Sequence, residues 1–178
     1  MSIRKQFKFI IDYFNKEQLD FAIVGAFALY AYGYTRATRD IDIITRLEYQ
    51  EKIITYFESQ DFKTLQKSEG FSNHLYPAGS IRIDFIYIDD NTAEEIFKAV
   101  KKMNIFDNIK LPVISPEHLI ALKLFAITND PERKFKDLAD IKELVKITNV
   151  NRDKVKHYFK KYQLEKYYNE IVEKYKEK

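Results

Sequence analysis

Hydrophobic and polar residues alternate along this chain with two periods, one typical of helices and one typical of strands. Residues 3–19 carry apolar side chains at helical spacing, among them Phe7, Ile10 and Phe14, which predicts an amphipathic N-terminal helix. Residues 40–45 alternate with a period of two, which predicts a strand. Because both periods recur through the first two thirds of the chain, we expect a small mixed sheet flanked by helices.

The same criteria predict the remaining elements. Further strands are expected at residues 21–25, 61–67, 71–76 and 80–88, and the pair before residue 80 reads as a hairpin around Gly70. Helices are expected at residues 26–32, 48–59 and 93–103, and a short extended segment at residues 105–114.

The C-terminal third is helical in pattern. Ser115 is an expected N-cap and Pro116 the first helical residue, and residues 149–153 form a break before the last two helices. The fold class predicted is α+β. A sheet-containing core would span residues 1–114, and a helical part packed on it would span residues 115–178, as a second domain or as the continuation of one domain.

Three aspartates occupy two of the predicted strands. Asp40 and Asp42 are at positions i and i+2, so their side chains project from one face. Asp84 lies in the strand at residues 80–88, which we expect to pair with the first. Clustered carboxylates repel one another unless a cation neutralises them, and Mg²⁺ prefers such oxygens. The trio indicates metal-dependent phosphoryl chemistry, although an Asp-x-Asp pair at a strand end is commonly only solvated.

Residues around the first strand are suited to phosphate. Gly25 separates an apolar strand from a helical segment that begins at Ala26, so backbone N–H groups at a helix N-terminus could cradle a phosphate. The alternative is that Gly25 only makes the turn. Arg36, Thr38 and Arg39 directly precede the aspartates; arginines there suit a triphosphate, or else they form ion pairs with the carboxylates.

Lys123 lies in a helix that is apolar nearly all round. A buried lysine needs a partner, so its ammonium either extends to solvent or meets Asp137, Asp140 or a bound triphosphate. We expect a Lys123–Asp137 pair bordering the nucleotide, with a structural role for Asp140. Since Asp137 would then lie near solvent, replacing Lys123 should cost less stability than replacing Asp137.

Composition limits the kinds of site that the chain can contain and the compartment that we expect for it. The chain has 178 residues, a net charge of +3 and no cysteine, which excludes disulfides and Cys-based zinc sites and fits a reducing compartment. No apolar signal segment follows the N-terminus and no apolar run reaches membrane-spanning length, so a cytoplasmic protein without a membrane partner is expected. The histidines, His74, His118 and His157, lack metal-ligand spacing.

The last part of the chain, residues 154–168, is rich in lysine and aromatic residues. Such a surface suits nucleic acid. It is interleaved with glutamates that continue beyond residue 168, however, and mixed charged faces are usually only solvated. RNA contact and simple solvation both remain open for this segment.

Taken in order, these motifs resemble a known superfamily. Val24-Gly25-Ala26-x-Ala28-Leu29 followed by Gly33-x-x-Arg36-x-Thr38-x-Asp40-Ile41-Asp42 resembles the first motif of polymerase-β-type nucleotidyltransferases. Ile83-Asp84-Phe85 resembles the strand that carries their third carboxylate. The helix with Lys123, followed by Lys136-Asp137-x-x-Asp140, resembles the late motif of the AbiEii-like branch, which includes the MenT-type toxins. The resemblance covers residues 20–148.

The resemblance implies an enzyme that uses an NTP such as ATP together with Mg²⁺ or Mn²⁺. It implies that Asp40 and Asp42 bind the metal, and that Asp84 helps to bind a second metal and orients or deprotonates the acceptor hydroxyl. Lys123 is the fourth expected catalytic residue. The expected nucleotide-binding residues are Gly25, Ala26, Arg36, Thr38, Arg39, Lys123 and Asp137. The chain has Gly25-Ala26 where the superfamily usually has Gly-Gly or Gly-Ser, so the serine hydroxyl is absent and the Ala26 N–H remains.

The motifs leave the acceptor open. The branch resemblance favours a toxin–antitoxin or abortive-infection enzyme acting on tRNA, with an antitoxin as a further partner. A second interpretation is transfer to a small molecule such as an antibiotic, or to a protein hydroxyl. A third, of another class, is a non-catalytic nucleotide-binding or regulatory module. The carboxylate trio argues against the third interpretation, whereas Gly25-Ala26 keeps it open.

Overall fold

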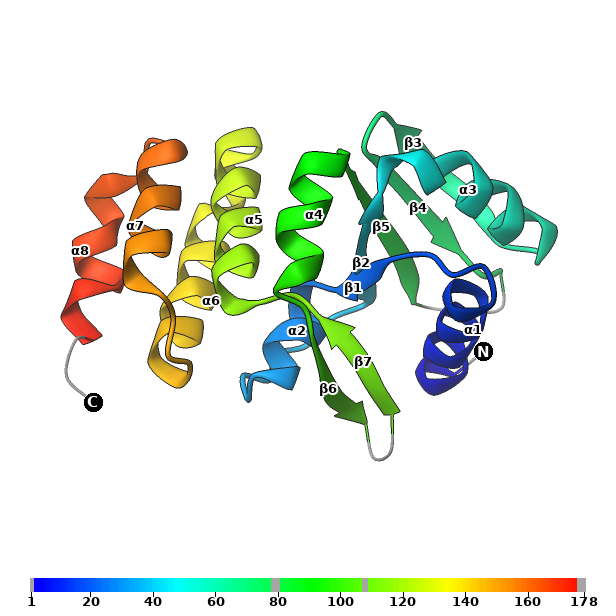
Figure 1. The fold of residues 1–178 in the computed structure, drawn as a ribbon, viewed down its shortest axis with the longest axis horizontal. Helices are drawn as coiled ribbons and strands as arrows, with labels where there is room; N and C mark the ends of the chain where they lie inside the picture. Colours follow the sequence, from blue (N-terminus) through cyan, green and yellow to red (C-terminus); the bar gives the residue numbers. More distant parts are fainter. Residues whose placement is uncertain (1, 78–80, 107–108, 176–178) are drawn as a thin grey trace. The chain divides into compact units, whose positions relative to one another are not determined.

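The computed structural model divides the chain into two compact units (Figure 1). The sheet unit consists of Met1–Phe27 and Arg36–Ile114, and the helical unit of Ala28–Thr35 and Ser115–Lys178. The short stretch around Ala28–Thr35 therefore groups with the C-terminal helices and not with the strands that flank it in sequence. The structure describes residues 2–77, 81–106 and 109–175.

The sheet unit is built on a seven-stranded mixed sheet in the order β3-β4-β5-β2-β1-β7-β6. Strands β2 and β5 are parallel, as are β1 and β7, and the other neighbours are antiparallel. The predicted α+β fold with a small mixed sheet is confirmed. The strands are β1 (Phe21–Ile23), β2 (Asp40–Arg46), β3 (Lys63–Ser68), β4 (Phe71–Leu75), β5 (Arg82–Ile88), β6 (Lys101–Phe106) and β7 (Ile109–Val113).

One face of the sheet is covered by α1 (Ile3–Lys16) and α3 (Gln50–Ser59), the latter preceded by a 3-10 turn at Leu47–Tyr49. Phe14 of α1 and Phe57 of α3 both pack against Phe85 of β5, with ring centroids 6.0 and 5.1 Å away. Because strand side chains alternate, the residues of β5 on either side of Phe85 point to the other face. That other face carries the aspartates and is called the aspartate face below.

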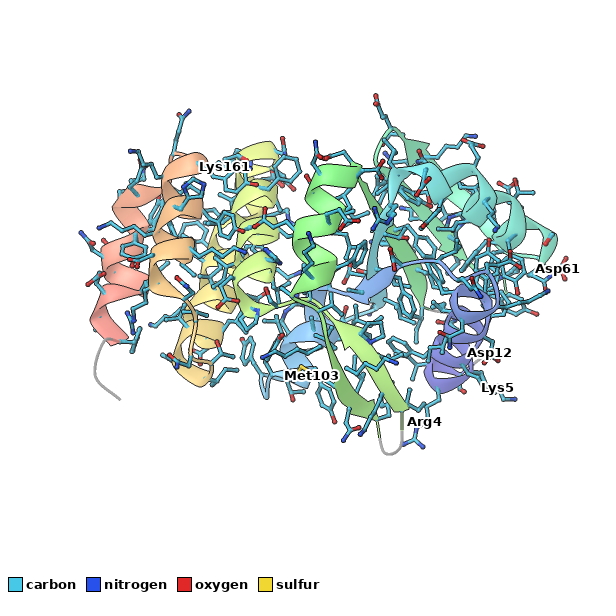
Figure 2. The ribbon with its side chains drawn as sticks, in the orientation of Figure 1. Arg4, Lys5, Asp12, Asp61, Met103 and Lys161 are labelled. Carbon is cyan, nitrogen blue, oxygen red and sulfur yellow. The ribbon has the colours of Figure 1, made fainter. Side chains whose placement is uncertain are left out.

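Helix α1 shows why the sequence pattern predicted it. The Ser2 side chain accepts a hydrogen bond from the backbone N–H of Lys5 and caps the helix. The apolar positions noted in the sequence are buried. The exposed side chains of Arg4, Lys5 and Asp12 extend from the outer surface of the helix (Figure 2).

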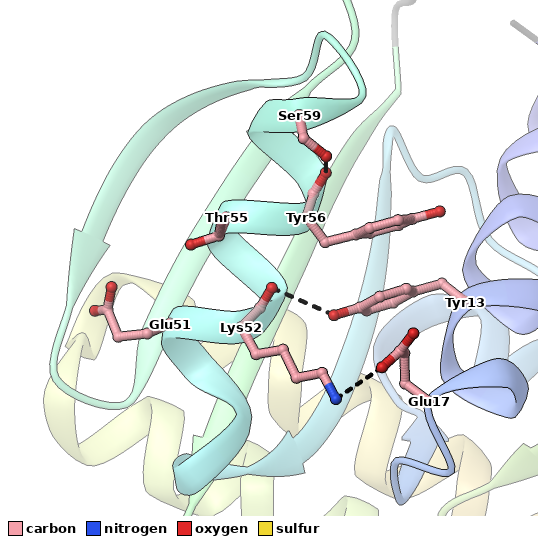
Figure 3. Close-up of a pocket in the computed structure, with 7 residues that line it drawn as sticks. All are labelled: Tyr13, Glu17, Glu51, Lys52, Thr55, Tyr56 and Ser59. Carbon is pink, nitrogen blue, oxygen red and sulfur yellow. Dashed lines mark hydrogen bonds and ion pairs between the residues drawn. The ribbon is translucent and has the colours of Figure 1, made fainter.

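A pocket lies between α1 and α3, on the face of the sheet opposite the aspartates (Figure 3). Its walls are held by structural contacts: the rings of Tyr13 and Tyr56 stack with centroids 3.7 Å apart, and Lys52 forms an ion pair with Glu17 at 2.8 Å. Burial raises the pKa of Tyr13 to about 12, with help from the charge of Glu17. These contacts tie the two helices together.

The segment before the helical unit differs from the expectation. Helix α4 (Asp90–Lys98) begins earlier than residue 93, because the Asp89 carboxylate accepts the backbone N–H of Thr92 and caps it there. It also ends before residue 103, and residues 101–106 form β6 instead. The extended segment expected at 105–114 covers the end of β6 and the whole of β7, and these two strands pair with each other. Residue 80 of the expected strand 80–88 and residues 107–108 lie outside the described residues.

The helical unit contains the end of α2 (Gly25–Ala31) and the helices α5 (Pro116–Asn129), α6 (Lys134–Ile147), α7 (Arg152–Lys161) and α8 (Glu165–Ile171). Ser115 accepts the backbone N–H of His118, which confirms the predicted N-cap with Pro116 in the first turn. Arg152 donates to the carbonyls of Val172 and Tyr175 and thereby ties α7 to the end of the described chain. Within the described residues no helix has the length and apolar character needed to cross a membrane.

Candidate active site

Asp42 and Asp84 lie directly opposite each other on the aspartate face. Strands β2 and β5 run parallel, and their register pairs Asp42 with Asp84 and Asp40 with Arg82. Since side chains two residues apart share a face, Asp40 and Asp42 project on the same side as Asp84. The buried isoleucines that alternate with Asp40 and Asp42, Ile41 and Ile43, point to the other face and anchor β2 in the core. The sequence alternation thus places the three aspartates on one surface.

Gly25, which follows β1, packs against the carboxylate of Asp42. Its φ is +60°, and a Cβ added there would lie 1.9 Å from Asp42 Oδ2. The backbone N–H of Val24 donates to the Asp42 carbonyl at 3.0 Å, which fixes the two segments side by side. Glycine is therefore required here both for the positive φ and for the close approach.

Arg82 is the site residue that sequence reasoning missed. Its guanidinium binds Asp84 through two hydrogen bonds of 2.7 and 2.9 Å, and lies 3.3 Å from an oxygen of Asp40. It precedes Asp84 by two residues on β5, so it shares the aspartate face. The Arg-x-Asp spacing within a predicted strand was the available signal, because it puts the two side chains on one face.

Asp84 is only 7 % exposed. Burial raises the pKa of Asp84 to about 6; the hydrogen bonds from Arg82 oppose this shift, and the charge of Asp42 adds to it. A carboxyl group with such a pKa can accept a proton near neutral pH, which is a requirement for a general base.

The three carboxylates do not form a ready-made metal site. Across residues 2–77, 81–106 and 109–175, no group of three or more His, Cys, Asp or Glu side chains is placed to hold a metal ion. Arg82 engages Asp84 and Asp40 in this arrangement, and the binding of a metal by Asp40, Asp42 and Asp84 stays a prediction. The donor set still fits Mg²⁺, which commonly takes only one or two carboxylates and completes its shell with phosphates and water.

The predicted phosphate-binding residues lie in the sheet unit at the approach to these carboxylates. Thr38 accepts the backbone N–H of Asp40 at 3.2 Å, so it shapes the turn into β2. Arg39 is exposed, and its carbonyl accepts the N–H of Arg82. Arg36 is partly buried, and Ala26 is buried beside Gly25 at the start of α2.

In the helical unit, Lys123 is buried and held by two aspartates. Its ammonium lies 2.9 Å from Asp137 on α6 and 2.5 Å from Asp140. Arg133 adds a second ion pair to Asp137 at 3.0 Å. Burial alone would raise the pKa of Asp137, but Lys123 and Arg133 outweigh it and hold that pKa below its ordinary value.

These contacts correct one expectation and refine another. Asp137 is completely buried, so the expectation that it lies near solvent is wrong. The predicted Lys123–Asp137 pair exists, but Asp140 shares the lysine. Lys123 thus meets two anions in place of the single one expected, and the three residues join α5 to α6.

The sequence belongs to the family described as the nucleotidyl transferase AbiEii toxin of type IV toxin–antitoxin systems, whose profile matches residues 12–175. The chain is therefore a nucleotidyltransferase of the polymerase-β type. No curated protein sequence matches it.

Solved structures share the fold at low sequence identity. The lincosamide antibiotic adenylyltransferase LnuA, with lincomycin bound, is 18% identical, with a TM-score of 0.58 over 83% of this chain and 99% of that one. ANT(2")-Ia in complex with adenylyl-2"-tobramycin is 15% identical, with a TM-score of 0.68 over 89% of this chain and 95% of that one. A nucleotidyltransferase described as putative, from Thermotoga maritima, is 14% identical, with a TM-score of 0.51 over 79% and 96%.

Proposed function

We propose that this nucleotidyltransferase moves a nucleotide from an NTP to an acceptor hydroxyl with the help of Mg²⁺ or Mn²⁺. One observation carries the proposal: Asp42 faces Asp84 across the parallel strands while Gly25 packs against the Asp42 carboxylate. Carboxylates that could hold a cation, a carboxylate with a raised pKa and a stretch of backbone without a side chain thus lie together.

In this proposal Asp40 and Asp42 hold the cation. When bound, the cation would neutralise charge on the triphosphate and on the departing pyrophosphate. Asp84 orients the acceptor hydroxyl and takes its proton, and Arg82 keeps the Asp84 carboxylate in a fixed orientation. The acceptor oxygen bonds to the α-phosphorus as the bond to pyrophosphate breaks.

The expected nucleotide-binding residues of the sheet unit are assigned to the phosphates. Gly25 and Ala26 would offer their backbone to the phosphates, and Arg36, Thr38 and Arg39 would bind the triphosphate from the loop before β2. Lys123 and Asp137 of the helical unit remain expected nucleotide-binding residues. Because Lys123 is held by two aspartates in the helical unit, its contribution would require partial release from them.

Two acceptors are supported by different observations. Membership of a toxin family favours tRNA, in a cytoplasm where an antitoxin would limit the damage. The second acceptor is an antibiotic-like small molecule, because LnuA is described as a lincosamide antibiotic adenylyltransferase and ANT(2")-Ia was solved with adenylyl-2"-tobramycin. This chain matches nearly the whole length of both. We place tRNA first and the small molecule second.

The test is transfer of label from each of the four α-³²P-labelled NTPs, with Mg²⁺ or Mn²⁺, to total tRNA, lincomycin or tobramycin. We expect one acceptor to be labelled and pyrophosphate to be released. Asp42→Asn should lower the rate by about a thousandfold. Asp12→Asn is the control, because Asp12 is exposed on α1, where it forms an ion pair with Lys8 of the same helix.

The outcomes separate the alternatives. Labelling of tRNA alone supports the toxin, and labelling of lincomycin or tobramycin alone supports the small-molecule enzyme. Labelling of none of the three, with each NTP and each metal, would overturn the proposed function and favour the non-catalytic module. Full activity in Asp42→Asn would contradict the role that the proposed mechanism gives to the carboxylates.

A further inference from the structure

A polar row continues across the aspartate face beyond Asp84. In the antiparallel pair of β4 and β5, Asn73 lies directly opposite Asp84, and in the pair of β3 and β4, Gln66 lies opposite Asn73. Directly opposed residues of neighbouring strands project from the same face. The row therefore runs Asp42, Asp84, Asn73, Gln66 over four adjacent strands, with Gly25 at its other end.

Asn73 is an unusual member of this row. The residue is only 6 % exposed, and its amide oxygen is buried without a hydrogen-bond partner among the described residues. A buried polar atom that lacks a partner costs stability, so such an atom in a native structure needs an explanation. Its neighbours on the opposite face of β4, Ser72 and His74, are in contrast both hydrogen-bonded.

Asn73 lies on the side from which the acceptor is expected to approach Asp84. In an in-line displacement the attacking and leaving oxygens lie on opposite sides of the phosphorus. The proposed function puts the triphosphate at the Gly25 and Asp42 end of the row, and the proton acceptor at Asp84. The attacking molecule then approaches from the far side of Asp84, which is the side occupied by Asn73 on β4.

We propose that Asn73 is an acceptor-binding residue, whose amide oxygen receives a hydrogen bond from a second hydroxyl of the acceptor, next to the hydroxyl that attacks. The acceptor class is a sugar with neighbouring hydroxyls, which a terminal ribose and an antibiotic sugar share. Gln66 on β3 is exposed and extends the same surface outward. This inference rests on the proposed function, and it adds a residue that binds the acceptor only.

The test compares Asn73→Leu with Ser72→Ala in the full chain. Leucine keeps the branched shape of asparagine, with somewhat larger end groups, and removes the polar atoms, so we expect the KM for the labelled acceptor, tRNA or tobramycin or lincomycin, to rise about tenfold. The KM for the NTP should not change. The Tm should stay the same or rise, because an unpartnered buried oxygen has been removed.

Ser72→Ala is the matched control from the same strand. Ser72 lies on the opposite face and bonds to His74 and Tyr87 at 2.9 and 2.8 Å. Its loss should lower the Tm and leave the KM for the acceptor unchanged. A purely structural role of Asn73 would give this same result, so the two variants must behave in opposite ways if Asn73 binds the acceptor.

The outcomes distinguish this inference from the function beneath it. If wild-type protein labels an acceptor but Asn73→Leu has an unchanged KM for it, the inference is wrong and the function stands. The same holds if Asn73→Leu raises the KM for the NTP as much as that for the acceptor. If wild-type protein labels no acceptor, the proposed function fails and this inference fails with it.

Discussion

Gly25 shows how a single residue can couple backbone geometry to the proposed chemistry. We predict that Gly25→Ala lowers transferase activity about a hundredfold, because the new methyl group would displace the Asp42 carboxylate by around an ångström. The positive φ adds a destabilisation of about 1–2 kcal/mol. Steady-state kinetics and chemical denaturation measure the two effects separately.

Gly70→Ala is the control for this prediction. Gly70 also belongs to the sheet unit and has a φ of +80°, but a Cβ there would meet only the Tyr87 carbonyl at 3.5 Å, an ordinary contact. The control should therefore lose stability and keep its activity. Equal loss of activity in both variants would mean that strain alone, and not contact with Asp42, explains the effect.

For single residues, the sequence predicted which face of a strand a side chain occupies better than it predicted which residue that side chain contacts. Asp40 and Asp42 could be placed on one face because strand alternation depends on neighbouring residues only. That Arg82 would bind Asp84 and Asp40 required the register of β2 against β5, which is a long-range property. Asn73 could not be found either, because its pairing with Asp84 depends on where β4 starts relative to β5.

Strand β4 illustrates how an element can carry different chemistry on its two faces. Its inner face holds His74, which is fully buried and bonded to Thr64 and Ser72. Burial lowers the pKa of His74 to about 4, and the charge of Glu58 opposes the shift only in part. The neutral imidazole is thus built into the core of the sheet unit.

We predict that His74 makes the stability of the protein depend on pH. Because its pKa is lower in the folded state than in the unfolded state, protonation favours unfolding, and stability is lost as the pH falls from about 6.5 to about 4. The loss should be about 3 kcal/mol. Urea unfolding at pH 7.5 and 4.5 should show it in wild type and in His157→Asn, whose histidine is exposed, but not in His74→Asn. An equal pH dependence in all three would contradict the assignment.

Helices α5 and α6 are joined by buried charge, and here the structure reverses an expectation from sequence. Removing Lys123 leaves Asp137 and Asp140 buried, whereas removing Asp137 still leaves Asp140 to pair with the lysine. We predict that Lys123→Met destabilises the protein by about 3–5 kcal/mol and that Asp137→Asn costs clearly less.

Chemical denaturation checks this order, with Lys136→Met as the control because Lys136 is exposed on the same helix, α6. A smaller loss for Lys123→Met than for Asp137→Asn would restore the original expectation. The sequence could indicate that a lysine on an apolar helix needs an anion. It could not indicate two anions, because the count depends on how α6 is rotated against α5.

For the whole molecule, the order of motifs was enough to predict the class of fold and the enzyme class. Local patterns were least informative at α4 and β6, where one predicted helix became a shorter helix and a strand. Residues 101–106 form a strand because β7 offers a partner for their backbone groups, a contact that no local pattern contains. The sequence also could not predict the substrate, because the shared fold accommodates more than one kind of acceptor.

Substitutions on helix α7 can distinguish tRNA from a small-molecule acceptor in the intact protein. Lys156 and Lys160 are both exposed on it, and the ammonium of Lys156 also lies 5.9 Å from the centre of the Tyr168 ring. We predict that the double variant Lys156→Glu and Lys160→Glu raises the KM for tRNA about tenfold, because fewer phosphate contacts can form. The KM for tobramycin or lincomycin should not rise, since neither molecule has a phosphate backbone.

A second double variant, Lys5→Glu and Lys16→Glu on α1, makes the same change in net charge on the sheet unit. If it raises the KM for tRNA as much as the α7 variant, the effect is one of overall charge and the C-terminal segment does not contact RNA. If neither variant changes the KM for tRNA at low salt or at physiological salt, the glutamates of the C-terminal segment neutralise its lysines. That segment is then an ordinary solvated face. Only a rise confined to the α7 variant assigns α7 to RNA binding.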